Sequence, residues 1–425
     1  MTVVPLRGPG VRSLGVTFVT LGLVYGIWYS YSVFLVALLR EFGWSRSVLA
    51  GAFSVFALVH GFSGLGLGWL GDRFGPRRLV IVGGVLLTVA VPLNGAVNQP
   101  WQLYATFGLL TAVGVATAGW VPAVILVQRW FPQRLGVALG VASSGVGMGI
   151  FLVVPLAQFL IDAGGWRWAF RVLGALMLAW VVPASVWLVR DPPAVPASSA
   201  TADRTRSAAG PVAAPASAAR IADTIARHGV TLGQALRTWR FWALGIIQIL
   251  GNMASQMLLV HQVAYLVDHR IPAIVAATVV SVVGLSSIAG KMGGGWFSDA
   301  FGRELAYTIG MACLAASIGV LGVVALAPNP RLAYVYAVLI GVGYAATAPL
   351  MPAVISDLFR GRHYGAIFGA LHVSNAMGGA FGPWLAGRIF DATGSYQAAF
   401  MTAVFTASLS AAGLWIVAPR RARPG

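Results

Sequence analysis

The chain has 425 residues, of which 58% are hydrophobic and only 9% are charged. Soluble globular domains carry about 25% charged residues, so this composition excludes an ordinary soluble domain and indicates a membrane protein. A formal net charge of +17 would suit a protein that binds nucleic acid. The positions of the basic residues along the chain decide whether this interpretation holds.

Apolar stretches long enough to cross a bilayer as helices recur along nearly the whole chain. The first one is long enough to span, and no cleavable signal peptide precedes it. The single cysteine, Cys313, lies in the ninth stretch and excludes an intramolecular disulfide. We place twelve stretches, at residues 14–39, 47–70, 78–97, 101–128, 134–161, 166–189, 240–267, 272–298, 304–327, 331–358, 362–390 and 394–418.

The arginines are distributed unevenly between the two membrane faces. If both termini are cytoplasmic, twenty of the 27 arginines fall on that side. This is the positive-inside pattern, so we expect cytoplasmic termini. The basic excess then reflects topology, and we expect no nucleic-acid partner.

One long interval interrupts the alternation of stretches and turns. Residues 190–239 are rich in Ala, Ser and Pro, which is typical of a disordered tether. They end in an expected interfacial helix with Thr231 as N-cap and Leu232, Leu236 and Trp239 on one face. We therefore divide the chain into an N-terminal six-helix bundle (1–189), a cytoplasmic linker (190–239) and a C-terminal six-helix bundle (240–425).

The two halves repeat each other in sequence. Pro122-Ala-Val-Ile recurs at Pro352, 230 residues later. A second set recurs in register 227 residues later, and it consists of Gly66, Gly68, Trp69, Asp72, Phe74 and Gly75. The pattern predicts an all-α membrane protein of twelve transmembrane helices in two pseudo-symmetric bundles, with a substrate site near the midplane between them.

The loop around residues 68–78, Gly-x-Leu-Gly-Asp-Arg-x-Gly-x-Arg-Arg, resembles the signature loop of the major facilitator superfamily, and residues 295–303 resemble its second-half copy. The resemblance covers essentially the whole chain. It implies that these loops latch the cytoplasmic gate through charge pairs and helix dipoles, whereas a plain topology signal is the competing interpretation. The gating candidates are Asp72, Arg73, Arg77, Asp299 and Arg303.

A narrower resemblance comes from residues 130–147, beginning Trp-Phe-Pro-Gln-Arg, and from residues 364–383. Both segments are similar to the monocarboxylate transporter and oxalate:formate antiporter group. Members of that group place a cation in the eighth span, and Lys291 matches it. Asn375 stands where dicarboxylate-handling relatives carry a lysine, and Ser287 where proton-coupled animal relatives carry an aspartate. These departures favour a monoanion and argue against the usual proton coupling.

Lys291, the only lysine, is the strongest candidate for chemistry. A cation at bilayer depth costs about 2.5–3.5 kcal/mol on insertion scales, so its presence suggests a binding partner. No Asp or Glu lies deep in any stretch, so an incoming anion would supply the missing charge. Anion binding would also favour the protonated amine and so couple a proton to the substrate. The alternative is an ammonium that snorkels toward Asp299.

Other polar side chains at bilayer depth complete the set of candidates. The neutral polar side chains could instead form hydrogen bonds between helices. The histidines could instead form structural hydrogen bonds. No two histidines share ligand spacing, so we expect no metal, and nothing indicates a cofactor. The substrate-binding candidates are Lys291, Tyr25, Tyr29, Asn252, Gln256, Tyr344, His372 and Asn375, and the proton-coupling candidates are Lys291, His372, His261 and His60.

The sequence thus favours a monomeric secondary transporter that moves small organic monoanions across a bacterial inner membrane by alternating access. Exchange, proton symport and uniport stay open. Alternatives are a transporter of the same fold for a larger amphipathic or drug-like anion, and a non-transporting membrane receptor. An enzyme is not expected, because no nucleophile–base or metal constellation is present.

Overall fold

The computed structural model describes residues 9–131, 135–187, 230–347, 350–359 and 364–418. Ten segments within these ranges are long and apolar enough to span a membrane. One of them, Ala138–Trp187, has 50 residues and contains a non-helical Gly165, so it supplies two crossings. The 30-residue α16 adds a further membrane-length helix. The expected all-helical membrane architecture is therefore confirmed.

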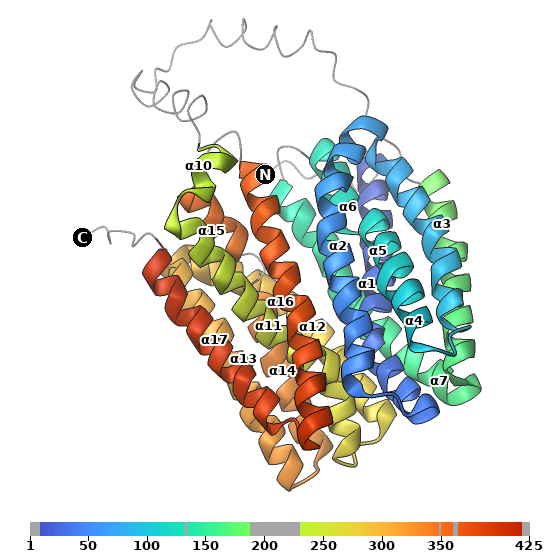
Figure 1. Ribbon diagram of the computed structural model, residues 1–425. Coiled ribbons are helices and arrows are strands. Elements are labelled where there is room, and N and C mark those ends of the chain that lie inside the picture. The colour runs from blue at the N-terminus through green and yellow to red at the C-terminus, as the bar shows by residue number, and fades with distance from the viewer. Residues whose placement is uncertain (1–8, 132–134, 188–229, 348–349, 360–363, 419–425) are drawn as a thin grey trace, which may run out of the picture.

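The first half of the chain forms one bundle, coloured blue to green in Figure 1. Its last two crossings are joined at Gly165, where φ is 81° and the helix turns back. The elements are α1 (Pro9–Phe42), α2 (Arg46–Phe74), α3 (Pro76–Asn94), α4 (Pro100–Leu103), the π-helix η1 (Tyr104–Thr111), α5 (Ala112–Ala118), α6 (Trp120–Trp130) and α7 (Leu135–Trp187).

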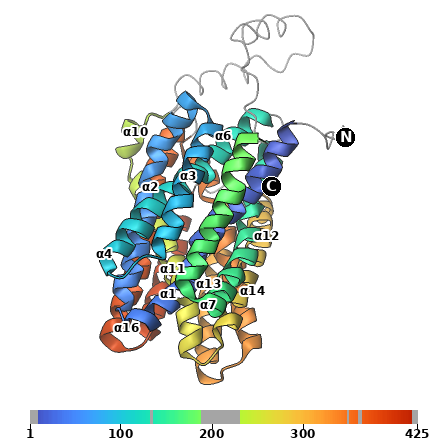
Figure 2. The same cartoon turned by 90° about the vertical axis from the view of Figure 1, so that its right-hand side faces the viewer.

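The second half forms the other bundle, coloured yellow to red, and the two bundles stand side by side in Figure 1; Figure 2 views them from the side of the first bundle, which lies in front. Its elements are α10 (Leu232–Leu236), α11 (Trp239–Asp268), α12 (Ala273–Phe301), α13 (Arg303–Leu326), α14 (Pro330–Ala346), α15 (Leu350–Leu358), α16 (Tyr364–Thr393) and α17 (Gln397–Val417). Residues 188–229, most of the predicted linker, lie outside the described ranges, so the division of the chain into three segments stays a prediction.

The end of the predicted linker forms a shorter helix than expected. Thr231 accepts a hydrogen bond from the Gln234 N–H and opens α10, but this helix ends at Leu236. Thr238 then caps a new helix, and Trp239 is the first residue of α11. Trp239 therefore does not share a helix face with Leu232, because a second cap starts a separate helix between them.

The sequence repeat is also a backbone repeat. Gly75 joins α2 to α3 with φ of 85°, and Gly302 joins α12 to α13 with φ of 108°. Both values lie in the region that favours glycine, so the same residue type is required at both turns. The two signature loops therefore adopt the same backbone conformation at this glycine.

The fourth and tenth stretches are not continuous helices, contrary to the prediction. The fourth is broken at Gly119, between α5 and α6, and in the tenth α14 ends at Ala346, before a turn at Thr347. Pro122 and Pro352 of the repeated Pro-Ala-Val-Ile lie just after these breaks. Proline has no N–H to donate to the residue four positions earlier, so the helix loses a bond at the same place in each half.

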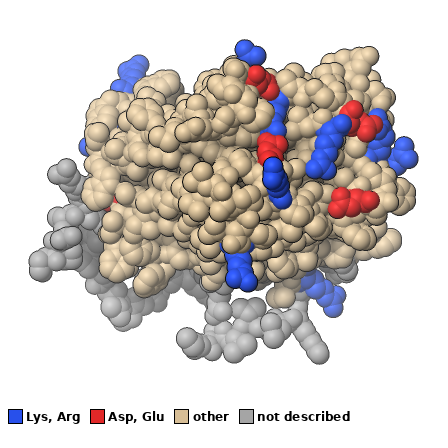
Figure 3. Space-filling view, turned by 90° about the horizontal axis from the view of Figure 1, so that it is seen from below, with Lys and Arg blue, Asp and Glu red and all other residues tan. Residues whose placement is uncertain are grey.

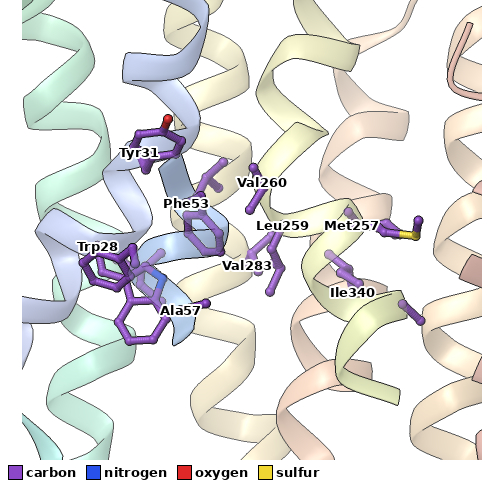
Figure 4. Packing of buried hydrophobic residues seen from close by; sticks show 14 of the residues in the cluster. Trp28, Tyr31, Phe53, Ala57, Met257, Leu259, Val260, Val283 and Ile340 are labelled. Carbon is purple, nitrogen blue, oxygen red and sulfur yellow. The ribbon is translucent and has the colours of Figure 1, made fainter. Parts of the chain in front are cut away.

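The two bundles meet along three pairs of helices, α1 with α11, α2 with α16, and α7 with α12. Small residues allow close approach, since a Cβ added to Gly147 of α7 would lie 2.7 Å from the Gly284 carbonyl of α12. An apolar core fills much of this interface. Figure 4 shows Phe53 of α2 between Trp28 of α1 and Val283 of α12.

Candidate functional site

Lys291 lies in α12 at the interface between the bundles. Gly147 of α7 packs against Ile288 of α12, so one further turn brings the Ser143–Ser144 pair opposite Lys291. The lysine is partly buried, and within the described parts of the chain its ammonium has no ion pair. Asp299, the expected snorkelling target, instead pairs with Arg303 at 2.5 Å. The geometry therefore favours an unpaired Lys291 ammonium over one that snorkels to Asp299.

A polar bridge crosses the interface one turn from Lys291. Tyr29 of α1 lies beside Tyr344 of α14, and Tyr344 lies beside Ser287 of α12. Tyr25 lies one turn from Tyr29 and Lys291 one turn from Ser287, each toward the face at which α7 ends and α10 begins. The bridge thus brings Tyr25 and Lys291 to a similar depth, on opposite sides of the interface.

An aromatic wall lines the N-terminal side of this region. The Tyr25 and Trp28 rings stack at 5.4 Å between centroids, and Trp28 meets His60 of α2 edge-on at 4.6 Å. The Tyr25 hydroxyl also lies beside Gly119 and the backbone of Trp120, at the start of α6. The broken fourth stretch therefore presents a helix N-terminus beside the wall.

The polar candidates of the C-terminal side are also brought together. Asn252 Nδ2 of α11 donates to the backbone oxygen of Asn375 at 2.7 Å and to its side-chain oxygen at 3.2 Å. Gln256 lies one turn along α11, and its Oε1 is buried without a hydrogen-bond partner in the described structure. These amides form a second polar group opposite the aromatic wall.

The three intramembrane histidines separate into two places. His60 and His372 interact electrostatically across the interface, and the His372 side chain is exposed and stacks on Phe368. His261 is fully buried nearer the other end of α11, where it contacts Tyr396 and Pro383. In the described residues no three His, Cys, Asp or Glu side chains form a group that could hold a metal ion.

The first signature loop makes contacts inside its own bundle. Arg73 stacks on Trp69, with its guanidinium carbon 5.3 Å from the ring centroid, whereas the side chain of Asp72 lies outside the described structure. Arg77 donates to the carbonyls of Ser185, at 3.1 Å, and of Val186, at the end of α7. A cation at a helix C-terminus is stabilised by the helix dipole.

The second signature loop does the same in its bundle. Arg303 pairs with Asp299 and, through Nε at 3.4 Å, with Asp357. The partners of Arg73, Arg77 and Arg303 named here thus belong to the same half as each arginine in this conformation. Their role as a gate latch remains a prediction.

The sequence analysis missed a charged cluster on the face opposite to the end of α7 and the start of α10, which we call the distal latch (Arg46, Asp268, Asp391 and Tyr396). Arg46 of α2 pairs with Asp268 of α11 at 2.7 Å and donates to the Tyr396 hydroxyl at 2.6 Å. Asp391 of α16 accepts the backbone N–H groups of Arg46 and Ser47 at 2.9 and 3.0 Å. Figure 3 shows basic and acidic side chains side by side on this face.

The distal latch joins the two bundles, so this conformation is closed at the distal face. The N–H groups at the start of α2 would otherwise lack partners, and Asp391 supplies them from the other half. Partial burial raises the pKa of Asp391, but hydrogen bonds from Ser47 and Arg46 outweigh it and hold the pKa below its ordinary value. The only hint in the sequence was an arginine at the start of the second stretch.

The comparisons with known proteins agree with this architecture. The model of the Major Facilitator Superfamily matches residues 17–316 and 244–425. Monocarboxylate transporter 13 of Bos taurus is 28% identical over 383 residues, covering 90% of this chain and 83% of its own length. Monocarboxylate transporter 2 of Homo sapiens is 24% identical and covers 97% of this chain and 86% of its own length.

A solved structure shares the fold. A bacterial homolog of the human lysosomal transporter Spinster, in an inward-facing and unoccupied conformation, aligns with a TM-score of 0.64 over 96% of this chain and 95% of that chain, at 16% identity. The chain is a multi-pass membrane protein and not an enzyme. It belongs to the Major Facilitator Superfamily and is a secondary transporter of that family.

Proposed function

We propose that this transporter moves small organic monoanions, of the short 2-oxo, 2-hydroxy or simple carboxylic acid class, by alternating access. The observation that carries the proposal is Lys291, a partly buried ammonium at the interface of the bundles with no counter-ion in the described structure. A buried charge requires a partner, and a substrate carboxylate supplies it. The names of the similar monocarboxylate transporters support the same substrate class.

The environment of Lys291 favours one carboxylate over two. Asn375 is neutral and already bonded to Asn252, so Lys291 is the only lysine or arginine among the substrate-binding candidates. The aromatic wall of Tyr25, Trp28 and His60 would contact the apolar part of the substrate. The arginine distribution supports cytoplasmic termini, and we place the protein in a bacterial inner membrane with the distal face toward the periplasm.

A second candidate substrate follows from the same wall. The Trp28 indole is buried, and its Nε1–H has no acceptor in the described structure. A bulkier amphipathic anion with an acceptor group would satisfy this donor and stack on the rings. Uptake of both classes should be compared in one assay.

The test is counterflow in proteoliposomes with a panel of short, branched and aryl monocarboxylates at controlled pH. Lys291→Ala should lower uptake roughly tenfold to a hundredfold or more, because a charge-assisted hydrogen bond contributes about 1.5–3 kcal/mol. Lys291→Arg should retain part of the activity. Met292→Ala, a change at an exposed neighbour on α12, is the matched control. Wild-type uptake by folded Lys291→Ala would rule out the site, whichever substrate the panel identifies.

A further inference from the structure

His261 connects to the distal latch through a chain of hydrogen bonds. Arg46 Nη1 lies 2.6 Å from the Tyr396 hydroxyl, and the same hydroxyl lies 2.9 Å from His261 Nδ1. The other ring nitrogen, Nε2, lies 2.9 Å from the Pro383 carbonyl. Both His261 and Tyr396 are almost completely buried, so water does not replace any of these partners.

The chemistry of the partners fixes the direction of every bond in this chain. A carbonyl only accepts, so His261 carries its proton on Nε2 and donates to Pro383. Arginine only donates, so the Tyr396 oxygen accepts from Arg46. The Tyr396 O–H is then free to donate to Nδ1, which must be unprotonated. The closed latch is therefore complete only when His261 is neutral.

A second proton on His261 would disturb the closed latch in two ways. Nδ1–H would point at an oxygen that already accepts from Arg46, and the buried phenol hydrogen would lose its acceptor. The imidazolium would also lie one tyrosine oxygen away from the Arg46 guanidinium, and like charges repel at this separation. Protonation therefore opposes closure of the distal face.

The other charged and titratable groups around His261 do not remove this conflict. Asp268 and Asp391 are both engaged by Arg46, through its side chain and backbone respectively. At the C-cap of its own helix, His269 contacts the Tyr265 carbonyl at 2.8 Å. The remaining groups of the packed elements are the neutral phenol of Tyr265, which reaches the Leu321 carbonyl, and Arg388 of α16, which is exposed.

We propose that His261 is a proton-binding site that controls the distal gate. The gate closes with His261 neutral, and opening carries Arg46 away with α2, which removes the nearest positive charge and the competing donor. By linkage, protonation stabilises the open form, so an acidic distal compartment holds the transporter open to that side. The proton leaves before closure and does not travel inward with substrate, so His261 regulates the gate and is not a carrier of coupled protons.

The test measures the gate without substrate and is independent of the substrate class. Spin labels at Arg40→Cys of α1 and Gln397→Cys of α17 report the distal distance, in a Cys313→Ser background that removes the only native cysteine. Both labelled positions are exposed. In lipid nanodiscs, lowering the pH from 8 to 5 should increase the ratio of open to closed distances, by at most about tenfold per pH unit for one proton.

The variants separate His261 from other sources of pH dependence. His261→Gln keeps a donor for Pro383 and an acceptor for Tyr396 but cannot be charged, so its distance ratio should not change with pH. His269→Gln, the matched control at the C-cap of the same helix, should behave as the wild type. Tyr396→Phe removes the competing hydroxyl without altering His261 and leaves the repulsion from Arg46, so it should reduce the response, and it serves if His261→Gln does not fold. An unchanged wild-type ratio, closure on acidification, or a wild-type response in His261→Gln would each overturn the proposal.

Discussion

Asn252 and Asn375 are hydrogen-bonded to each other in the C-terminal bundle. Asn252 Nδ2 reaches both the backbone oxygen and the side-chain oxygen of Asn375, at 2.7 and 3.2 Å. The backbone bond does not depend on the side chain at position 375. This position can therefore be changed while Asn252 keeps one acceptor.

Asn375→Lys should shift selectivity toward dicarboxylates. A second ammonium among the polar groups of the interface would pair with a second carboxylate, and a gain of about 1.4 kcal/mol would raise the dicarboxylate-to-monocarboxylate ratio about tenfold. Competition uptake with succinate-like and acetate-like acids measures this ratio. Asn375→Gln is the neutral control, and an unchanged ratio in Asn375→Lys would mean that position 375 does not face the substrate.

Gly147→Ala should destabilise the contact between the two bundles. The added Cβ would lie 2.6 Å from Ile288 Cγ1 and 2.7 Å from the Gly284 oxygen, and overpacking of this kind costs about 1–3 kcal/mol. We expect a thermal midpoint several degrees lower in detergent. Gly140→Ala on the same helix has no atom within 4 Å of the new methyl and should show no loss. Equal midpoints for the two variants would contradict the close crossing.

Arg77→Ala should destabilise the N-terminal bundle. Its guanidinium satisfies two carbonyls at the end of α7, and a cation at a helix C-terminus contributes roughly 0.3–2 kcal/mol. Arg78→Ala removes the same positive charge from the loop at an exposed neighbouring residue. It is the control for the effect of loop charge on membrane topology. Thermal unfolding of both variants checks the expectation; equal losses would assign the loop to topology alone.

Asp391→Asn should weaken the distal latch in a pH-dependent way. The folded pKa of Asp391 lies below its ordinary value, so its contribution is fully present above about pH 4 and is lost as the pH falls through the folded pKa. Wild type and Asp391→Asn should therefore differ most in thermal midpoint near neutral pH and converge in acid. This window lies well below that of histidine, so a difference that instead disappears between pH 7 and 6 would assign the effect to another group.

Much of the fold follows from local sequence. Apolar length predicts the helices, and the repeated glycines at 75 and 302 predict that the two halves share their turns. The breaks at Gly119 and after Ala346 were missed, although the prolines of the repeated motif lie beside both. A proline lowers helix stability, but packing against neighbouring helices determines whether the helix kinks or ends there.

The candidate site was predicted in part. Lys291 can be identified from the sequence alone, because a single cation in an apolar stretch costs free energy in the membrane whichever helices it packs against. The bridge of Tyr29, Tyr344 and Ser287 joins three helices, and no spacing along the chain reveals it. His261 was grouped with the other histidines by its depth, whereas the structure places it behind the distal latch.

The helical membrane architecture, the twofold repeat and the isolated cation follow from local sequence, because hydropathy, glycine turns and charge are properties of short segments. Which side chains meet across the two bundles depends on how the helices pack in three dimensions. Arg46 and Asp391 are 345 residues apart, and their contact depends on how two separately formed bundles pack. The gate therefore depends on this packing, since its free energy comes from charges that approach one another only in the assembled interface.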